Sequence, residues 1–427
     1  MTALVLVLFS IGFVFFFVTT LIILHNKKHF RGLISNRSEA VSTSGFDSTE
    51  NILEGQSLAQ LNSNTVSEDY KLPAPKVSIL IPARNEERNL YRLLDSIESQ
   101  TYSRLEVIIL DDHSEDRTRL IADEFALASR FQITVHSGLH KPAGWGGKNW
   151  ACHQLADHAS GDVLLFLDAD TWLASTTVSD IVINLQRYKL DFATVWPHQV
   201  MATAAEKAIV SNVYATIATY LPTLYSYKSP AWIPGRTLKN KTKPLFAAAC
   251  GQCMIFTREA YKISGGHSSI KDQVVEDVLL AQKVVQSGKS MRMFHGTDRL
   301  WCRMYDSHEE IFNGFRKNFF AGFGYRLFPF LMAWILHAIV YLVPPVVFLF
   351  AAAGAFPDQF QLTILILSAV LTFIPMLQRF WVSKFFKWPA ETTLLYLPGI
   401  LWFQMLAVIV VLDRLLKTRA TWKGRPV

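Results

Sequence analysis

Two aspartates with a single alanine between them follow an apolar stretch near the middle of the chain. The stretch VLLFL ends at Leu167, and Asp168 and Asp170 come directly after it. Two carboxylates this close repel each other, so we expect a cation beside them. Hard oxygen ligands favour Mg²⁺ or Mn²⁺, ions that also bind through substrate phosphates. The pair therefore predicts a divalent metal site and a diphosphate substrate, with a solvated acidic turn as the alternative.

Acidic and amide side chains also follow two other apolar stretches. Asp112 comes after LEVIILD, and Asn85 and Glu86 come after VSILIPAR. If these stretches are parallel strands, their carboxyl ends meet at one edge of a sheet, where ligands bind. We expect Asp112 to accept hydrogen bonds from a base or a ribose, and Asn85 and Glu86 to line the same pocket. The alternative for Asp112, together with Ser114, is to cap the following helix.

A lysine lies beside glycines in GWGGKNWA, just before a stretch with a helical pattern. Glycines let the backbone approach an anionic group closely, and a cation beside a helix N-terminus favours a phosphate. Lys148 is therefore predicted to contact the diphosphate, although the GxxxxGK[ST] spacing of a Walker motif is absent. The alternative is a surface lysine in a flexible loop.

Two further acids open a predicted helix in KDQVVEDVLLAQKVVQSGK, residues 271–289. Apolar positions give this helix one buried face and Gly288 ends it, so Glu276 and Asp277 fall in its first turn. Acids at this position commonly stabilise the helix dipole. In a transferase pocket, such a carboxylate can instead take the proton from an acceptor hydroxyl during a direct displacement. We predict Asp277 to be that base.

Apolar strands alternate with helical patterns through the region that holds these residues. The strand-like stretches are VSILIPA, LEVIILD, QITVHS and VLLFL, and the helical stretches between them include RTRLIADEFALA and KNWACHQLADHA. This alternation predicts βαβ units and an α/β fold with a mostly parallel sheet. The predicted domain covers residues 73–326.

The N-terminal end of the chain is apolar. Half of the 427 residues are hydrophobic, and residues 2–24 form an uncharged run long enough to cross a bilayer. Lys27, Lys28 and Arg31 follow this run, so the positive-inside tendency puts the N-terminus outside and the next segment in the cytoplasm. We therefore predict a transmembrane anchor at residues 1–25 and a catalytic domain on the cytoplasmic side of the plasma membrane.

The segments on either side of the predicted domain complete a multi-pass membrane protein. Residues 26–72 are predicted to be a flexible linker, because from residue 35 onward they are polar and lack apolar periodicity. Residues 327–427 are predicted to be a membrane region with a helical hairpin, an interfacial segment at 379–390 and a further apolar stretch. Two or three spans remain possible, because a last full crossing would leave the basic tail outside and a re-entrant path would keep it inside.

The net charge of +7 does not indicate a nucleic-acid-binding protein. The basic residues gather beside apolar spans, where anionic lipid head groups account for them. The four cysteines include the pair CGQC, but neither a second pair nor histidines at ligand spacing accompany it, so ordinary reduced thiols are expected.

The motifs IPARNEE, LDDHSEDRT, FLDADT, SGGH and VEDVLLA occur in an order that resembles the family 2 glycosyltransferases. This resemblance covers about residues 77–320 and implies a membrane-associated, inverting enzyme with the GT-A nucleotide-sugar-binding fold. It implies nucleotide contacts from Ala83, Asn85, Glu86 and Asp112, sugar-diphosphate and metal contacts from Asp168 and Asp170, and a catalytic base at Asp277.

Within that family, the chain looks most like bacterial carotenoid- and hopanoid-associated transferases and ceramide glucosyltransferases. It departs from the polymer-making members, which carry QxxRW after the base. Here NGFRKNFF keeps Arg316 but places Asn313 and Lys317 where those members have Gln and Trp. The missing Trp argues against a processive polysaccharide synthase. Arg316 is predicted to bind the diphosphate, or alternatively to anchor a juxtamembrane helix.

The function expected from these observations is transfer of one sugar from a nucleotide-diphosphate sugar to a lipid hydroxyl at the cytoplasmic membrane face. Carotenoid- or hopanoid-type acceptors fit the resemblance best, with a ceramide-like lipid left open. The alternatives are a polysaccharide or polyprenyl-phosphate sugar synthase, and a catalytically inactive membrane scaffold. Intact acids at every predicted position argue against the scaffold.

Overall fold

A mixed eight-stranded sheet with helices on both faces lies at the centre of the protein, in the order β3-β2-β1-β4-β7-β6-β8-β5. The computed structural model describes residues 2–35, 74–416, 421–422 and 425–426. The strands of this sheet are β1 (Val77–Ala83), β2 (Leu105–Asp111), β3 (Gln132–Ser137), β4 (Val163–Leu167), β5 (Thr171–Leu173), β6 (Phe192–Gln199), β7 (Cys253–Thr257) and β8 (Met291–Cys302). Four pairings are parallel and three are antiparallel. The predicted α/β class is therefore confirmed, and antiparallel β7 separates two parallel groups of strands.

The strands nearest the predicted site are buried on both faces. Every residue of β2 and β4 is buried, which is typical of parallel strands covered by helices on each side. In the register of β1 with β2, Ala83 lies opposite Asp111. The loops that follow these strands therefore leave the sheet side by side.

Two sets of helices cover the two faces of the sheet. On one face lie α3 (Leu90–Glu98), α4 (Thr118–Ala128) and α6 (Thr177–Arg187); on the other lie α5 (Gly147–His158), α7 (Ala204–Tyr220), α10 (Glu276–Gln286) and α11 (His308–Ala321). Helix α3 buries Leu90, Leu93, Leu94 and Ile97, the spacing of one helix face. Three further helices are short: α8 (Arg236–Thr242), α9 (Arg258–Ile263) and α14 (Glu391–Leu394).

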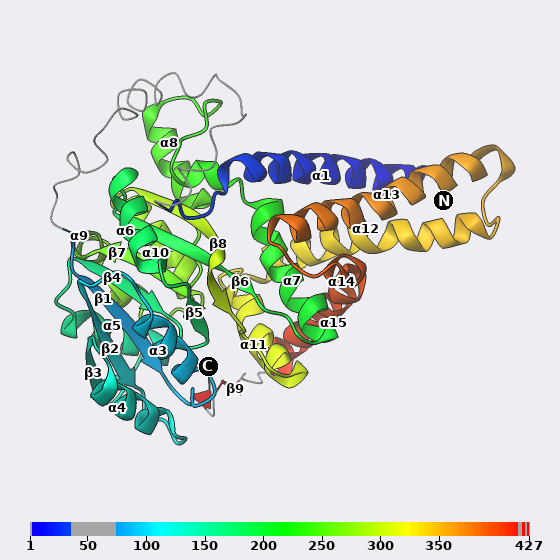
Figure 1. Ribbon diagram of the computed structural model, residues 1–427. Coiled ribbons are helices and arrows are strands. Elements are labelled where there is room, and N and C mark those ends of the chain that lie inside the picture. The colour runs from blue at the N-terminus through cyan, green and yellow to red at the C-terminus, as the bar shows by residue number, and fades with distance from the viewer. Residues whose placement is uncertain (1, 36–73, 417–420, 423–424, 427) are drawn as a thin grey trace.

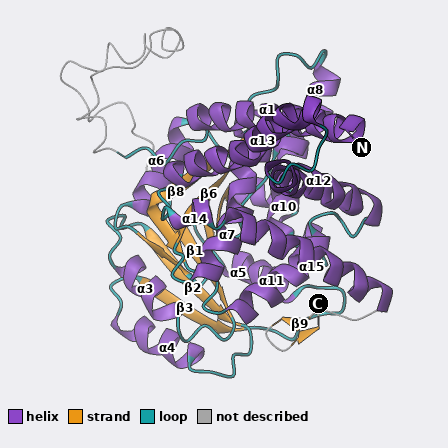
Figure 2. Cartoon of the chain, turned by 90° about the vertical axis from the view of Figure 1, so that its right-hand side faces the viewer, coloured by secondary structure: helices purple, strands orange, loops and turns teal. Residues whose placement is uncertain are grey.

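Four helices in the described residues are long and apolar enough to cross a membrane. They are α1 (Thr2–His29), α12 (Leu327–Ala352), α13 (Asp358–Phe385) and α15 (Tyr396–Leu416). Helices α1, α12 and α13 pack together and extend away from the sheet (Figures 1 and 2). This arrangement confirms apolar helices at both ends of the domain. Helix α13 continues to Phe385 and so includes the first part of the segment predicted to be interfacial.

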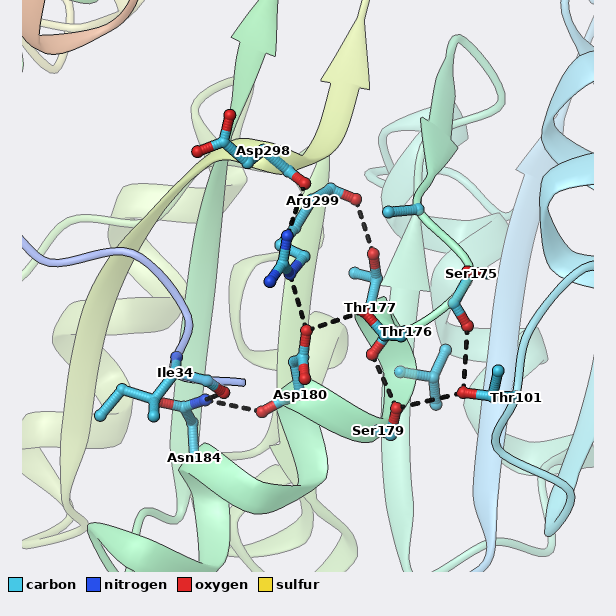
Figure 3. A network of polar contacts seen from close by, with 12 residues as sticks. Ile34, Thr101, Ser175, Thr176, Thr177, Ser179, Asp180, Asn184, Asp298 and Arg299 are labelled. Carbon is cyan, nitrogen blue, oxygen red and sulfur yellow. Dashed lines mark hydrogen bonds and ion pairs between the residues drawn. The ribbon is translucent and has the colours of Figure 1, made fainter. Parts of the chain in front are cut away.

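The last turn of α1 and the segment that follows it are bonded to the domain, although the sequence predicts a flexible linker from residue 26. Asn26 is buried, and its Nδ2 donates to Leu221 O at 2.7 Å. Further along, Ile34 and Asn184 exchange two hydrogen bonds at 3.0 and 3.3 Å (Figure 3). The same network holds α6 to β8 through Arg299, whose Nε donates to Asp180 at 2.7 Å. Residues 36–72 of the predicted linker lie outside the described residues.

Candidate active site

The loops after β1, β2 and β4 open into one large cavity of about 1720 Å³. The predicted site residues that line it are Ala83, Asn85, Glu86, Asp112, Lys148, Asp168, Asp170 and Asp277. Residues separated by up to 194 positions in the chain thus share one cavity, as the strand-end argument requires.

The turn that carries Asp168 and Asp170 is held in place on both sides. Asp168 N donates to Gln252 O at 3.2 Å. Thr171 donates back to Asp168 O through its backbone N–H and its hydroxyl, at 3.2 and 2.8 Å. Pairing of β5 with β8 sets Thr171 opposite Cys302. The two carboxylates are therefore presented by a rigid turn.

Lys148 forms the centre of a charge cluster at the start of α5. Its Nζ lies 2.8 and 2.9 Å from the two oxygens of Asp168 and 3.2 Å from Glu276 Oε1. Burial alone would lower the pKa of Lys148, but the two carboxylates raise it well above its ordinary value. Lys148 is therefore an ammonium ion held between the β4 turn and α10. The flexible surface lysine of the alternative interpretation does not match this geometry.

Asp170 offers an oxygen that the protein leaves unused. Its Oδ1 is buried and has no hydrogen-bond partner among the described residues. Burial, and then the charge of Asp168, raise the pKa of Asp170 to about 7. A bound cation would offset both the burial of the Asp170 carboxylate and its repulsion by Asp168. The described residues contain no group of three His, Cys, Asp or Glu placed to hold a metal. The unpartnered oxygen of Asp170 fits a hard divalent ion, which also binds phosphate oxygens and water.

Asp277 lies in the first turn of α10, and both of its carboxylate oxygens accept backbone hydrogen bonds. Oδ1 accepts from Val278 N at 2.8 Å, and Oδ2 accepts from Gly251 N at 2.9 Å. A side chain at position 251 would meet Glu276 Oε1 and Lys148 Nζ at 3.3 Å, so glycine allows this close approach. Burial, and then the charge of Glu276, raise the pKa of Asp277 to about 7. A carboxylate with this pKa is suited to general base chemistry.

The end of the cavity beside β1 and β2 is built from two loops that bond each other. Asn85 adopts a left-handed backbone conformation with φ 52°. Its N–H donates to Ser114 Oγ at 3.0 Å, and its Oδ1 accepts from Glu115 N at 2.9 Å. Ser114 therefore ties the two loops together, and the first N–H of α4, that of Thr118, donates to Asp116 Oδ1 at 3.0 Å. The capping alternative for Asp112 and Ser114 does not match these bonds.

Arg316 is placed away from the cavity, contrary to its predicted contact with the diphosphate. Its guanidinium forms a two-bond ion pair with Asp413 of α15, at 2.6 and 2.5 Å. This pair joins α11 to α15, so Arg316 anchors a helix beside the membrane segment, which is the alternative interpretation. The sequence separation of Arg316 and Asp413 explains why no local pattern revealed their pairing.

Two groups that contribute to the cavity were not predicted to do so. Glu276 bonds Lys148, although only its neighbour Asp277 was assigned a role. The cavity also extends between α7, α12, α13 and α15, where it is lined by Tyr220, Trp334, Arg379 and Phe403 among others. The position of Glu276 in the first turn of a helix, next to Asp277, could have indicated that it also faces the cavity. No local sequence pattern indicates that α7, α12, α13 and α15 meet around the cavity.

Comparisons with known proteins agree with this architecture. Residues 78–263 match the model of the family "Glycosyl transferase family 2". The 4,4'-diaponeurosporenoate glycosyltransferases of Staphylococcus haemolyticus and Staphylococcus aureus (strain MRSA252) are 27% and 25% identical to the chain, over 58% and 62% of its length. The aligned part spans 61% and 65% of those relatives.

Solved structures similar to this chain include two glycosyltransferases. The mannosyltransferase PcManGT from Pyrobaculum calidifontis, in complex with GDP-Man and Mn²⁺, has a TM-score of 0.46 and 16% identity, covering 96% of this chain and 99% of that one. Residues 1–349 of Staphylococcus aureus TarS, in complex with UDP, have a TM-score of 0.37 and 18% identity, covering 56% of this chain and 63% of that one. The family match and the mixed sheet agree with the GT-A fold expected from the sequence. Residues 78–263 of the chain therefore match a domain of the glycosyl transferase family 2.

Proposed function

We propose that the protein transfers a single sugar from a nucleotide-diphosphate sugar to a hydroxyl group of a membrane lipid, with inversion at the sugar carbon. One observation carries this proposal. A single cavity is lined at one end by the acids and the lysine at the sheet edge, and at the other by helices that can cross a membrane. Such a cavity suits a water-soluble donor that meets an apolar acceptor.

The donor is assigned to the sheet end of the cavity. Ala83, Asn85, Glu86 and Asp112 would contact the nucleotide, and Lys148 would stabilise the leaving diphosphate by charge. Asp170, together with Asp168, would hold Mg²⁺ or Mn²⁺. When bound, this ion would neutralise charge on the diphosphate.

Asp277 is assigned as the base. Its carboxylate would accept the proton of the acceptor hydroxyl as the oxygen attacks the sugar carbon and the nucleoside diphosphate leaves. The backbone hydrogen bonds from Val278 and Gly251 fix its orientation. A single displacement of this kind inverts the configuration at the sugar carbon.

A carotenoid- or hopanoid-type lipid is the proposed acceptor. The names of the Staphylococcus relatives support the carotenoid class, and the aromatic walls of the cavity support an apolar chain. We place the catalytic domain at the cytoplasmic face of the plasma membrane, because the basic residues in the last turn of α1 favour that side.

The test uses the full chain, purified in detergent, with labelled nucleotide sugars, a lipid extract and Mn²⁺. We expect transfer of label to a lipid, and a loss of at least about 100-fold in Asp277→Asn, within the range for removal of a general base. Donor binding should persist in this variant. Full transfer by Asp277→Asn would overturn the base assignment, and absence of both transfer and donor binding in the unaltered protein would overturn the function.

A further inference from the structure

An arginine lies at the membrane end of the cavity without an acidic partner. Arg379 belongs to α13 and is only 5% exposed. Its Nε donates to Thr392 O at 3.4 Å, and its Nη2 donates to Ser211 Oγ. These acceptors are neutral. Among the residues that the structure describes, no Asp or Glu forms an ion pair with Arg379, whereas Lys207 and Arg316 nearby pair with Glu391 and Asp413.

An uncompensated guanidinium is unfavourable in this position. A buried charge without a counter-ion costs several kcal/mol, and ionisable groups within membrane segments commonly mark ligand sites. The two hydrogen bonds use only part of the donor set of a guanidinium, whose planar fork matches carboxylate and phosphate oxygens. Arg379 also lines the cavity. An oxyanion inside the cavity would supply the missing charge.

Polar side chains from two other helices line the same part of the cavity. Tyr220 of α7 hydrogen-bonds the hydroxyl of Tyr341 and Nε2 of His337, each at 3.0 Å. Both tyrosines lie within electrostatic reach of the Arg379 guanidinium. The cluster therefore combines one cation with hydroxyl groups that can also donate hydrogen bonds to an oxyanion.

The cavity that holds both this cluster and the sheet-edge acids also has aromatic walls. Phe330 and Trp334 of α12 and Phe403 of α15 line it. The cavity thus offers polar groups at the sheet edge and beside Arg379, and aromatic side chains that suit a hydrocarbon chain. A lipid with one terminal hydroxyl and a simple hydrocarbon tail would leave Arg379 without a partner.

We propose that Arg379, with Tyr220, Tyr341 and His337, binds a carboxylate or phosphate group that the acceptor carries away from its reacting hydroxyl. The acceptor is then an anionic hydroxy-lipid with polar groups at two separated positions. This inference rests on the proposed function, since it assumes that the cavity holds the acceptor. An anionic phospholipid of the bilayer has the same oxyanion chemistry and is the competing source.

Binding without donor tests this subsite separately from transfer. The full chain is placed in phosphatidylcholine nanodiscs, and the binding of tritiated ω-hydroxypalmitic acid is compared with that of the corresponding uncharged diol, after subtraction of empty discs. We expect Arg379→Gln to weaken binding of the acid at least about tenfold, the loss of one charge-assisted hydrogen bond. Binding of the diol should change less than about threefold.

Lys384→Gln is the matched control, because Lys384 is a basic residue of the same helix that is exposed and does not line the cavity. It should leave both affinities unchanged. An equal loss for the acid and the diol in Arg379→Gln, or no loss for the acid, would overturn the proposal. If Arg379→Gln fails to elute as a single species, Tyr341→Phe carries the same comparison, with a smaller expected loss that is again confined to the acid.

A second arm distinguishes the acceptor from a bilayer lipid. The measurement is repeated in discs that contain phosphatidylglycerol. Unchanged acid binding by the unaltered protein supports an acceptor site, whereas competition by phosphatidylglycerol that disappears in Arg379→Gln assigns the site to a phospholipid and overturns the proposal. Because no donor is present, selective acid binding can be observed even if the transfer assay fails.

Discussion

Asp277 and Glu276 are adjacent acids in the first turn of α10, yet their surroundings give them different properties. Glu276 bonds the Lys148 ammonium, whereas the Asp277 carboxylate accepts hydrogen bonds from the backbone N–H groups of Gly251 and Val278. One carboxylate therefore helps to fix a cation, and the other is left available for a proton. The pKa of Asp277, raised to about 7 by burial and by Glu276, makes this division measurable.

We expect transfer to rise with pH through an apparent pKa near 7, because only the ionised form of Asp277 can accept a proton. The effect on stability has the opposite sign. A carboxyl whose pKa is higher in the folded state than in the unfolded chain makes folding less favourable as pH rises from about 4 to 7. The measurement is the pH profile of kcat/KM for the acceptor at saturating donor.

Glu276→Gln tests whether the charge of Glu276 raises the pKa of Asp277. Removing the neighbouring negative charge should move the acid limb of the profile to lower pH, although the lost contact with Lys148 is also expected to reduce the rate. An acid limb below pH 5 in the unaltered protein would contradict the assignment of Asp277.

At the scale of single residues, the sequence indicates which acids share the cavity, but it does not indicate every ion-pair partner. Asp112, Asp168 and Asp277 were predicted because each stands at the end of a strand or the start of a helix, and these positions follow from local patterns. The pairing of Arg316 with Asp413 was not predicted, because Asp413 lies on another helix and the contact depends on tertiary packing.

A few buried polar contacts hold the membrane helices in position relative to the sheet. Asn26 is the clearest case. Its side chain is 1% exposed, donates to Leu221 O, and accepts from the N–H and hydroxyl of Thr223 at 2.9 and 3.0 Å. Helix α1 is thereby joined to the end of α7, a wall of the cavity.

Asn26→Ala should therefore destabilise the protein. The substitution leaves buried backbone groups of residues 221 and 223 without partners, at a cost of roughly 2–3 kcal/mol. We expect the apparent Tm in detergent to fall by roughly 2–4 °C, since the entropy of unfolding grows with chain length. Ser10→Ala is the control, because Ser10 is exposed and donates to a carbonyl of its own helix. Equal Tm values for the two variants would show that the contacts of Asn26 do not hold α1 to the domain.

Element positions were predictable to different degrees. The strands β1 to β4 appear where apolar runs end in turn residues, so local patterns predicted them. The antiparallel insertion of β7 between β4 and β6 was not predictable, since it pairs strands far apart in the sequence. Residues 26–35, within the predicted linker, include the last turn of α1 and bond distant segments through Asn26 and the backbone of Ile34.

At the scale of the whole molecule, the domain and the membrane helices share one hydrophobic core. The cluster on the α5 face of the sheet includes Phe30, Phe330, Val382 and Leu406. The catalytic cavity runs through this joint core, so the two parts of the molecule form one site. Sequence patterns predicted both parts but not their common cavity, because its walls come from helices that meet only in the folded chain.

Filling the cavity at the membrane end should reduce transfer to the lipid without weakening donor binding. Ala333 of α12 lines the cavity, so Ala333→Trp would place an indole in the path of the acceptor. We expect at least about tenfold loss of transfer to lipid, with the Kd for the donor unchanged within about twofold, because the donor is assigned to the sheet end. Ile335→Trp is the matched control, since Ile335 is 51% exposed on the same helix and does not line the cavity. Isothermal titration gives donor affinity, and a radiolabel assay gives transfer. Weakened donor binding in Ala333→Trp, or full transfer to lipid, would mean that the acceptor does not enter between the membrane helices.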